Sequence, residues 1–268
     1  AGTVVSNGGT LDTGGWNLSY EAVTISGMGA GGAGAVVNTI SNQNQTLRLL
    51  TLAGDAAVGG AFRWDVRGSG AIGDATVEGG AYTLYKVGPN IVGLTHVKAS
   101  FGDLVVSQGT FTVEATTTMN PEYDVTMAPG TAFRWYNLLT PLGRDFTIDQ
   151  GRFYSDAGTL GVHNILTGTV TIATAMTNGL GNFTLAGPVT GPGMLVKAES
   201  GITALTSDNN TFTGGVQINA GTLRIGDNGT SGSLGAGPVT NNATLQFARI
   251  DTATWTNAIF GAGTLNKI

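Results

Sequence analysis

The chain has 268 residues, a net charge of −5, no cysteine and only twelve Lys and Arg residues. This composition excludes disulfides and thiolate metal sites, and it leaves no basic surface for nucleic acid. Glycine is abundant at 44 residues and charged residues are scarce at 11%, against a usual share of about 25%, so turns are frequent and reactive groups rare.

Short runs rich in Val, Ile, Thr, Leu and Phe recur along the chain between Gly, Asn and Asp turn signals. Helical periodicity is hard to find, and no apolar run approaches the roughly 18 residues of a membrane helix. In chain order, the sequence predicts strands at residues 22–26, 47–53, 81–87, 103–107, 146–149, 167–173 and 221–225.

An internal repeat links these runs. Asp103, Asp124 and Asp145 follow one another at intervals of 21, and a glycine stands six residues after each, at Gly109, Gly130 and Gly151. Further on, the tripeptides that begin at Gly221, Ala243 and Gly263 read GTL, ATL and GTL, at intervals of 22 and 20.

A period of about 20–22 residues is too short for helical repeats and matches one coil of a β-solenoid. We therefore predict an all-β fold, a single right-handed parallel β-helix with about 13 coils that form a rod on the order of 60 Å long. Right-handedness follows from the general preference of parallel crossovers. Inward positions should form ladders of Val, Ile, Leu and Phe, and Gly should turn the corners.

Residues 210–247 read NTFTGGVQINAGTLRIGDNGTSGSLGAGPVTNNATLQF. This segment resembles the autotransporter-associated β-strand repeat, with its NTYTGGT element, I-x-x-G-T-L strand and S-L-G-x-G-P-V turn. Residues 261–268, GAGTLNKI, resemble the opening of a further repeat. The resemblance implies a passenger-type β-helical stalk at the bacterial cell surface or secreted from the cell, and it implies no catalytic residues.

We expect residues 1–268 to form one continuous β-solenoid, with residues 205–268 as the autotransporter-associated repeat segment. No amphipathic segment covers either end, so we expect both ends to be cut from a longer chain or to stack on other copies. The leading hypothesis is a non-enzymatic structural or adhesive stalk with no cofactor and no metal. Its expected partners are other copies, as a homo-oligomer or filament, and surface glycans, with no nucleic acid and no membrane span.

The carboxylates leave two alternatives open. The column of Asp103, Asp124 and Asp145 suits turn capping, although a Ca²⁺ ladder would use the same oxygens. A polysaccharide lyase or glycoside hydrolase of β-helix type would need paired carboxylates, for which the candidates are Asp55, Asp65, Asp74, Asp149 and Asp156. A lyase would also need a base, and Arg144 beside Asp145 and Asp149 is the candidate.

Other residues that suggest chemistry have ordinary explanations. His96 and His163 lack metal-ligand neighbours in the sequence, no G-x-S-x-G motif is present, and the glycine string at residues 27–35 lacks the Lys-Ser/Thr of a phosphate loop. A carbohydrate-binding module would need an exposed aromatic row, and the candidates for it are Trp64, Trp135, Tyr136 and Trp255. We favour burial of these rings between coils.

Overall fold

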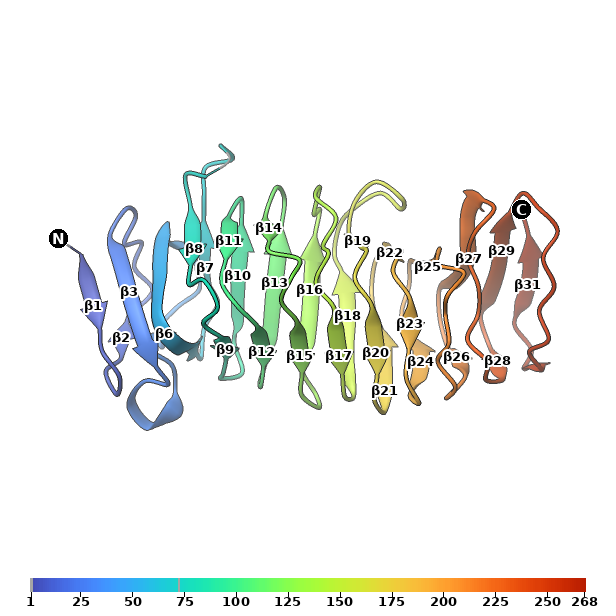
Figure 1. The fold of residues 1–268 in the computed structure, drawn as a ribbon, viewed down its shortest axis with the longest axis horizontal. Coiled ribbons are helices and arrows are strands. Elements are labelled where there is room, and N and C mark those ends of the chain that lie inside the picture. The colour runs from blue at the N-terminus through green and yellow to red at the C-terminus, as the bar shows by residue number, and fades with distance from the viewer. Residues whose placement is uncertain (1, 72) are drawn as a thin grey trace.

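The computed structural model describes residues 2–71 and 73–268, and it shows a rod of stacked parallel strands (Figure 1). The N-terminus lies at one end of the rod and the C-terminus at the other, and the chain colours follow the long axis in order. Each coil contributes short strands to three faces in turn, and every pairing between strands of adjacent coils is parallel. The predicted all-β solenoid is confirmed.

The first face is built from short strands whose core residues are mainly Val, Leu, Ile and Phe. Its strands are β2 (Leu11–Asp12), β4 (Val36–Asn38), the second half of β6 (Leu49–Gly60), β9 (Leu84–Lys86), β12 (Leu104–Val106), β15 (Val125–Met127), β17 (Phe146–Ile148), β20 (Val170–Ile172) and β23 (Val189–Thr190).

The second face extends over most of the rod. Its strands are β5 (Gln43–Leu47), β7 (Trp64–Arg67), β10 (Ile91–Thr95), β13 (Thr110–Glu114), β16 (Ala132–Tyr136), β18 (Gly151–Ser155), β21 (Ala175–Asn178), β24 (Met194–Lys197), β26 (Val216–Ile218), β28 (Val239–Asn241) and β30 (Ile259–Phe260).

The third face has two separate series of strands, and between them Leu142 forms an isolated bridge to Leu166 of the second series. The first series is β1 (Thr3–Val5), β3 (Ala22–Gly27), the first half of β6, β8 (Thr76–Glu78), β11 (Lys98–Ser100) and β14 (Thr118–Met119). The second is β19 (Ile165–Leu166), β22 (Phe183–Leu185), β25 (Ile202–Leu205), β27 (Thr222–Gly229), β29 (Thr244–Arg249) and β31 (Thr264–Lys267).

The 21-residue spacing appears as a column in space. Leu104 pairs with Val125, and Val125 pairs with Phe146, so the aspartate before each of these strands lies at the same corner. All seven predicted strand segments contain a strand. The glycine string at residues 27–35 leaves the coil after β3 as an excursion that contains one 3-10 turn, η1 (Ala30–Gly32).

The three glycines spaced by 21 residues do not share one position in the coils: Gly109 and Gly151 directly precede the paired residues Thr110 and Arg152, and Gly130 lies two residues before their partner Ala132. Gly109 and Gly130 turn the corner before β13 and β16 with φ values of 67° and 77°. Gly151 instead lies inside β18, and Gln150, with φ 53°, takes the left-handed position. The corner between β15 and β16 is one residue longer than the corners on either side of it, since Val106 and Ile148 both pair with Met127 while Thr110 and Arg152 both pair with Ala132.

The interior is one continuous core that runs along the rod. Around the middle coils it is aromatic: Phe133 contacts the rings of Phe111, Trp135, Phe146 and Phe153 at centroid distances of 5.0–6.3 Å. These contacts join neighbouring coils and two faces. Stability of such a stack accumulates from contacts between adjacent coils.

Candidate binding surfaces

Two aspartates of the column, Asp103 and Asp145, cap the corner between the third and first faces. The Oδ1 atom of Asp103 accepts the backbone N–H of Asp124 at 3.0 Å, and Oδ1 of Asp145 accepts that of Thr169 at 2.6 Å. Asp55 does the same for the backbone N–H of Thr83 at 2.9 Å. Each carboxylate therefore bonds a backbone donor in the next coil, which is the capping role expected of Asp at turns.

The described residues hold no group of three His, Asp or Glu side chains arranged for a metal ion. The two histidines bond near neighbours: Nδ1 of His96 lies 2.9 Å from the Thr116 hydroxyl, and Nδ1 of His163 accepts the backbone N–H of Thr159 at 3.0 Å. Both histidines therefore make local contacts at corners of the solenoid.

The carboxylates considered for glycoside hydrolysis are engaged elsewhere. Asp65 is fully buried against Arg63 and Arg67, Asp74 contacts Arg48, and Asp156 contacts Arg134. Hydrogen bonds from Ser69 lower the pKa of Asp74. A general acid needs the opposite, a raised pKa, so Asp74 is poorly suited to general-acid catalysis. Asp65 and Asp156 are held in ion pairs with arginines.

Asp149 differs from the other four, since its Oδ1 atom is buried and makes no hydrogen bond within the described part of the chain. It lies in the turn between β17 and β18, and its backbone N–H bonds the carbonyl of Met127.

Arg144, the candidate base of a lyase, is wholly buried. Its guanidinium donates to the carbonyls of Asn120, Gly102 and Phe101 at 2.6–2.9 Å and stacks on the Phe101 ring at 4.7 Å. Burial lowers its pKa to about 10. The side chain therefore links backbone segments of successive coils, and the guanidinium is not available to a substrate.

Two buried lysines were missed by sequence reasoning. Lys86 donates to the carbonyls of Val87, Gly88 and Gln108 at 2.7–3.1 Å, and burial lowers its pKa to about 7. Lys197 donates to the carbonyls of Gly179 and Glu199, and burial lowers its pKa to about 8. Each stands two residues after a core leucine and so lies on the inward side of its strand. This alternation was the sequence signal that could have predicted burial of both lysines.

The four aromatic residues proposed for a sugar-stacking row have different environments. Trp64 and Trp135 are fully buried, so they cannot belong to such a row, because their rings fill the core between coils. Trp255 is partly buried and packs on Phe247 at a centroid distance of 4.2 Å. Tyr136 is 43% exposed, at the outer end of β16.

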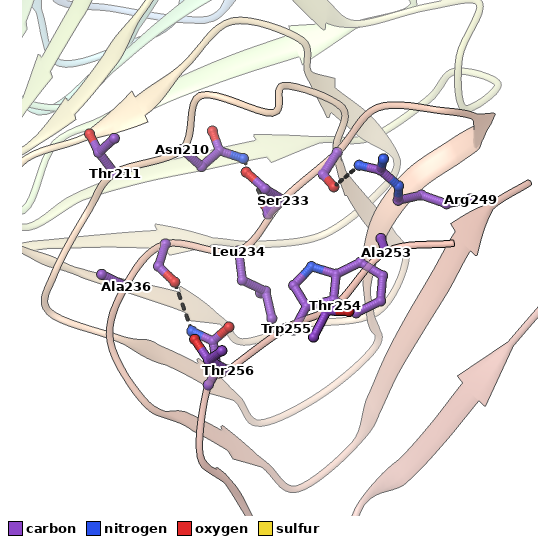
Figure 2. Close-up of a pocket in the computed structure, with 13 residues that line it drawn as sticks. Asn210, Thr211, Ser233, Leu234, Ala236, Arg249, Ala253, Thr254, Trp255 and Thr256 are labelled. Atoms are coloured by element: carbon purple, nitrogen blue, oxygen red, sulfur yellow. Dashed lines mark hydrogen bonds between the residues drawn. The ribbon is translucent and has the colours of Figure 1, made fainter. Parts of the chain in front are cut away.

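A pocket of about 410 Å³ lies beside Trp255 in the last coils (Figure 2). Its polar wall is tied to the backbone: Asn210 donates to the carbonyls of Ser207 and Ser233, and Asn257 donates to those of Gly235 and Gly237. Arg249 bonds Asp208 and the carbonyl of Gly232. These side chains hold three successive coil segments together around the pocket.

The outer side of the second face carries a network of charged residues near its N-terminal end. Glu114 on β13 is 4% exposed and forms ion pairs with Arg63, Arg67 and Arg134 at 2.7–3.1 Å. Asp65 on β7 pairs with Arg63 and Arg67 at 2.7–2.8 Å. Burial by itself would raise the pKa of Glu114, but the arginines and the Thr95 hydroxyl outweigh it and lower the value.

Gly93 makes room for this network. It stands between Asp65 and Thr112 in the register of β7, β10 and β13. A Cβ atom at Gly93 would lie 2.4 Å from Oδ1 of Asp65, which is too close for any real contact. The missing side chain therefore lets the carboxylate of Asp65 lie flat against the sheet.

Two polar cavities adjoin the network. One, of about 250 Å³, is lined by Asn44, Arg63, Arg67, Glu114, Arg134 and Tyr136. The other, of about 310 Å³, is lined by Asn17, Ser19, Gln45, Arg48, Arg67, Gly68 and Ser69. Arg67 lines both cavities, and the neighbouring residues Asn44 and Gln45 line one each, so the two cavities lie side by side.

A bulge in β5 forms the wall they share. Gln43 pairs with Trp64 and Leu47 with Val66, so β5 has two more residues than β7 over the same stretch. The extra length pushes Asn44 and Gln45 outward, where both are exposed. Arg67 bonds the carbonyl of Asn44 and keeps the bulge in place.

Comparison with known proteins confirms the resemblance to passenger repeats. Residues 195–225 match the passenger-associated transport repeat family. The match begins in β24, upstream of the segment that carries the resemblance in sequence, and ends within β27.

One similar curated protein is the adhesin BmaC autotransporter of Brucella suis biovar 1 (strain 1330), with 45% identity over 87 residues. The matched segment is 31% of this chain and 2% of the adhesin, so the chain corresponds to a small part of a protein of that kind. No solved structure matches the fold. The two sequence matches support the expected secreted or cell-surface location.

The described part of the chain contains no helix that is both long enough and apolar enough to cross a membrane.

Proposed function

We propose that the chain is a non-enzymatic, adhesive segment of an extracellular bacterial stalk, in which the solenoid both spaces and carries binding surfaces. The single observation that supports this most is the combination of a passenger repeat match with 45% identity to part of an adhesin. The rod shape suits a spacer, because stacked coils extend a surface in one direction. We further propose that residues 1–268 act as one unit, with residues 205–268 as its repeat segment.

Adhesion can be tested with beads. Beads coated with the purified chain should adhere to monolayers of cultured epithelial cells more than beads coated with albumin at the same density. Soluble chain added in excess should compete the adhesion away. Equal adhesion of the two bead types, with no competition, would contradict the adhesive role.

Absence of enzymatic activity is tested separately. The chain should release no new reducing ends and no unsaturated products from polygalacturonate or neutral polysaccharides, with or without Ca²⁺. Product formation that tracks the protein through purification would instead support the lyase or hydrolase alternative.

End-to-end association into an oligomer or filament remains a prediction. Size-exclusion chromatography over a range of concentrations, combined with electron microscopy, separates the outcomes. Longer rods at higher concentration would support association, and rods of one length at every concentration would contradict it.

A further inference from the structure

We propose that the two adjoining polar cavities on the second face form a binding site for a neutral oligosaccharide of at least two sugar units. This inference rests on the proposed adhesive function and specifies a ligand class and a place for it. The site is defined by the cavity of Asn44, Arg63, Glu114, Arg134 and Tyr136, the cavity of Asn17, Ser19, Gln45, Arg48 and Ser69, and Arg67 between them.

The balance of charge favours a neutral ligand. Arg48, Arg63, Arg67 and Arg134 carry four positive charges around the cavities, and Asp65, Asp74, Glu114 and Asp156 carry four negative charges in direct contact with them. A phosphate or sulfate would find no excess positive charge, and the chain as a whole has a charge of −5. A hydroxyl-rich ligand can instead both donate to the carboxylates and accept from the guanidinium groups.

The side chains are fixed before any ligand arrives. Arg63 bonds both carboxylate oxygens of Asp65, and Glu114 accepts from three arginines and from Thr95. Side chains held in this way lose little further freedom on binding, which is a main cost of recognising a polar ligand. Burying so many charges brings no clear gain in stability over apolar packing, so a binding role accounts for the network better than a structural role.

Donors remain for a ligand. Within the described part of the chain, Arg63 and Arg67 use Nε and Nη2 for protein partners, and Arg134 uses Nε and Nη1. Each guanidinium thus keeps one terminal nitrogen without a hydrogen-bond partner in the protein. Asn44 and Gln45 add exposed amides on the bulge between the two cavities.

A tyrosine accompanies each cavity. Arg134 lies over the ring of Tyr136 at 5.0 Å, and Arg48 lies over the ring of Tyr20 at 4.6 Å. Both tyrosines are largely exposed, at 43% and 62%. An exposed ring beside rigid polar groups offers an apolar surface to the C–H face of a sugar. Two cavities with one tyrosine each suggest at least two sugar units.

The experiment is an array of immobilised neutral and acidic oligosaccharides probed with the folded chain. We expect binding to neutral oligosaccharides of two or more units. Tyr136→Ala should weaken this binding by about tenfold through the loss of ring contact. Gln45→Ala, on the exposed bulge, should weaken it by about three- to tenfold through lost hydrogen bonds.

Tyr82→Ala is the matched control. Tyr82 is 45% exposed, close to the value for Tyr136, but lies outside both cavities, so its loss should leave array binding unchanged. Circular dichroism and thermal unfolding check that all three variants keep the wild-type fold. The inference is wrong if the array stays empty, if only acidic glycans bind, or if both cavity variants bind like the wild type.

This outcome is separable from the adhesive function. Beads that adhere to cells while the array stays empty would leave adhesion standing and reject the saccharide site. Array binding without adhesion of beads would support the site and reject the adhesive role.

Discussion

The middle coils and the C-terminal coils share one backbone plan but fill it with different residues. Between β13 and β22 the interior is aromatic, with Phe133 and Trp135 at its centre, and the outer face nearby carries charged networks. After β24 the interior columns are mainly aliphatic, such as Leu223 on Leu245, and the outer face of strands β26 and β28 carries Gln217 and Thr240.

The family match falls in the second of these regions. The comparison teaches that coil stacking requires a spacing and an inward apolar column, and does not require a particular residue. Any set of side chains that fills the interior and satisfies the corners supports the same register. The middle coils accordingly place stacked aromatic rings and a network of ion pairs on the same backbone plan.

The largest expected effect comes from the aromatic interior. Phe133→Ala should lower the free energy of unfolding by about 3–5 kcal/mol, because it opens a cavity among four rings. Urea denaturation, monitored by tryptophan fluorescence, measures this free energy. Tyr82→Ala, at an exposed position, should change the value by less than about 0.5 kcal/mol. If Phe133→Ala lowered the free energy of unfolding as little as Tyr82→Ala does, the proposed contribution of the aromatic core to stability would be wrong.

The charged network comes next. Glu114→Gln should cost about 3–5 kcal/mol, because it leaves three arginines short of a buried partner. Asp227→Asn is the matched change in the C-terminal coils, where the Asp227 side chain is 27% exposed against 6% for Glu114, and it should cost about 0–1 kcal/mol. Equal costs in urea denaturation would mean that the two regions do not differ as described.

The Glu114 contribution also has a pH dependence. Its folded pKa lies below the ordinary value of 4.5, so its stabilising effect is complete above that pH and is lost as the pH falls through the folded pKa. The stability difference between wild type and Glu114→Gln should therefore narrow on acidification. Thermal unfolding across the acidic range measures it, and a gap that widens would reject the assignment.

A smaller effect tests the space beside Asp65. Gly93→Ala should cost about 1–3 kcal/mol, because its Cβ would meet Oδ1 of Asp65 at 2.4 Å. Gly229→Ala is the matched control in the C-terminal coils, since no atom lies within 4 Å of the added Cβ, and it should be close to neutral. If the two variants lost a comparable free energy of unfolding, the absence of a side chain at Gly93 would not be needed to accommodate the Asp65 carboxylate.

The buried lysines give the smallest change at neutral pH. Burial lowers the pKa of Lys86 to about 7 from 10.5, so between these values the unfolded chain keeps a proton that the folded chain has released. The free energy of unfolding of the wild type should therefore rise with pH across this window, compared with that of Lys86→Met. Below about pH 7 the two free energies should change with pH in the same way.

Thermal unfolding at about pH 6, 8 and 10 checks this difference. Lys197→Met, with a pKa lowered to about 8, is the counterpart on β24. The same slope in wild type and both variants would show that neither lysine releases its proton on folding.

Several features could be predicted from residues alone. The strands, the parallel solenoid, the aspartate column and the repeat segment all follow from local patterns: apolar runs, turn residues and a fixed period. Gly130 shows the limit of this reasoning, because a constant period in the sequence hides a corner between β15 and β16 that is one residue longer than the corners on either side. At the next corner Gln150 takes the left-handed position, and no local signal marks it.

The binding surface could not be predicted in the same way. Arg63, Glu114 and Arg134 lie far apart in the chain, and they meet because three coils place them on one outer face. The bulge at Asn44 and Gln45 and the space at Gly93 are visible only once the strands are paired. Similarly, Arg144 was considered as a base because Asp145 and Asp149 are near it in sequence, and the fold buries it against backbone carbonyls instead.

The sequence by itself determined the architecture of this protein, because coil length, inward apolar residues and corner residues act locally and repeat. Only the tertiary structure decided which polar side chains meet, because stacking brings together residues one or more coils apart in the chain. Ion pairing and cavity shape depend on that lateral register, which a linear period does not specify.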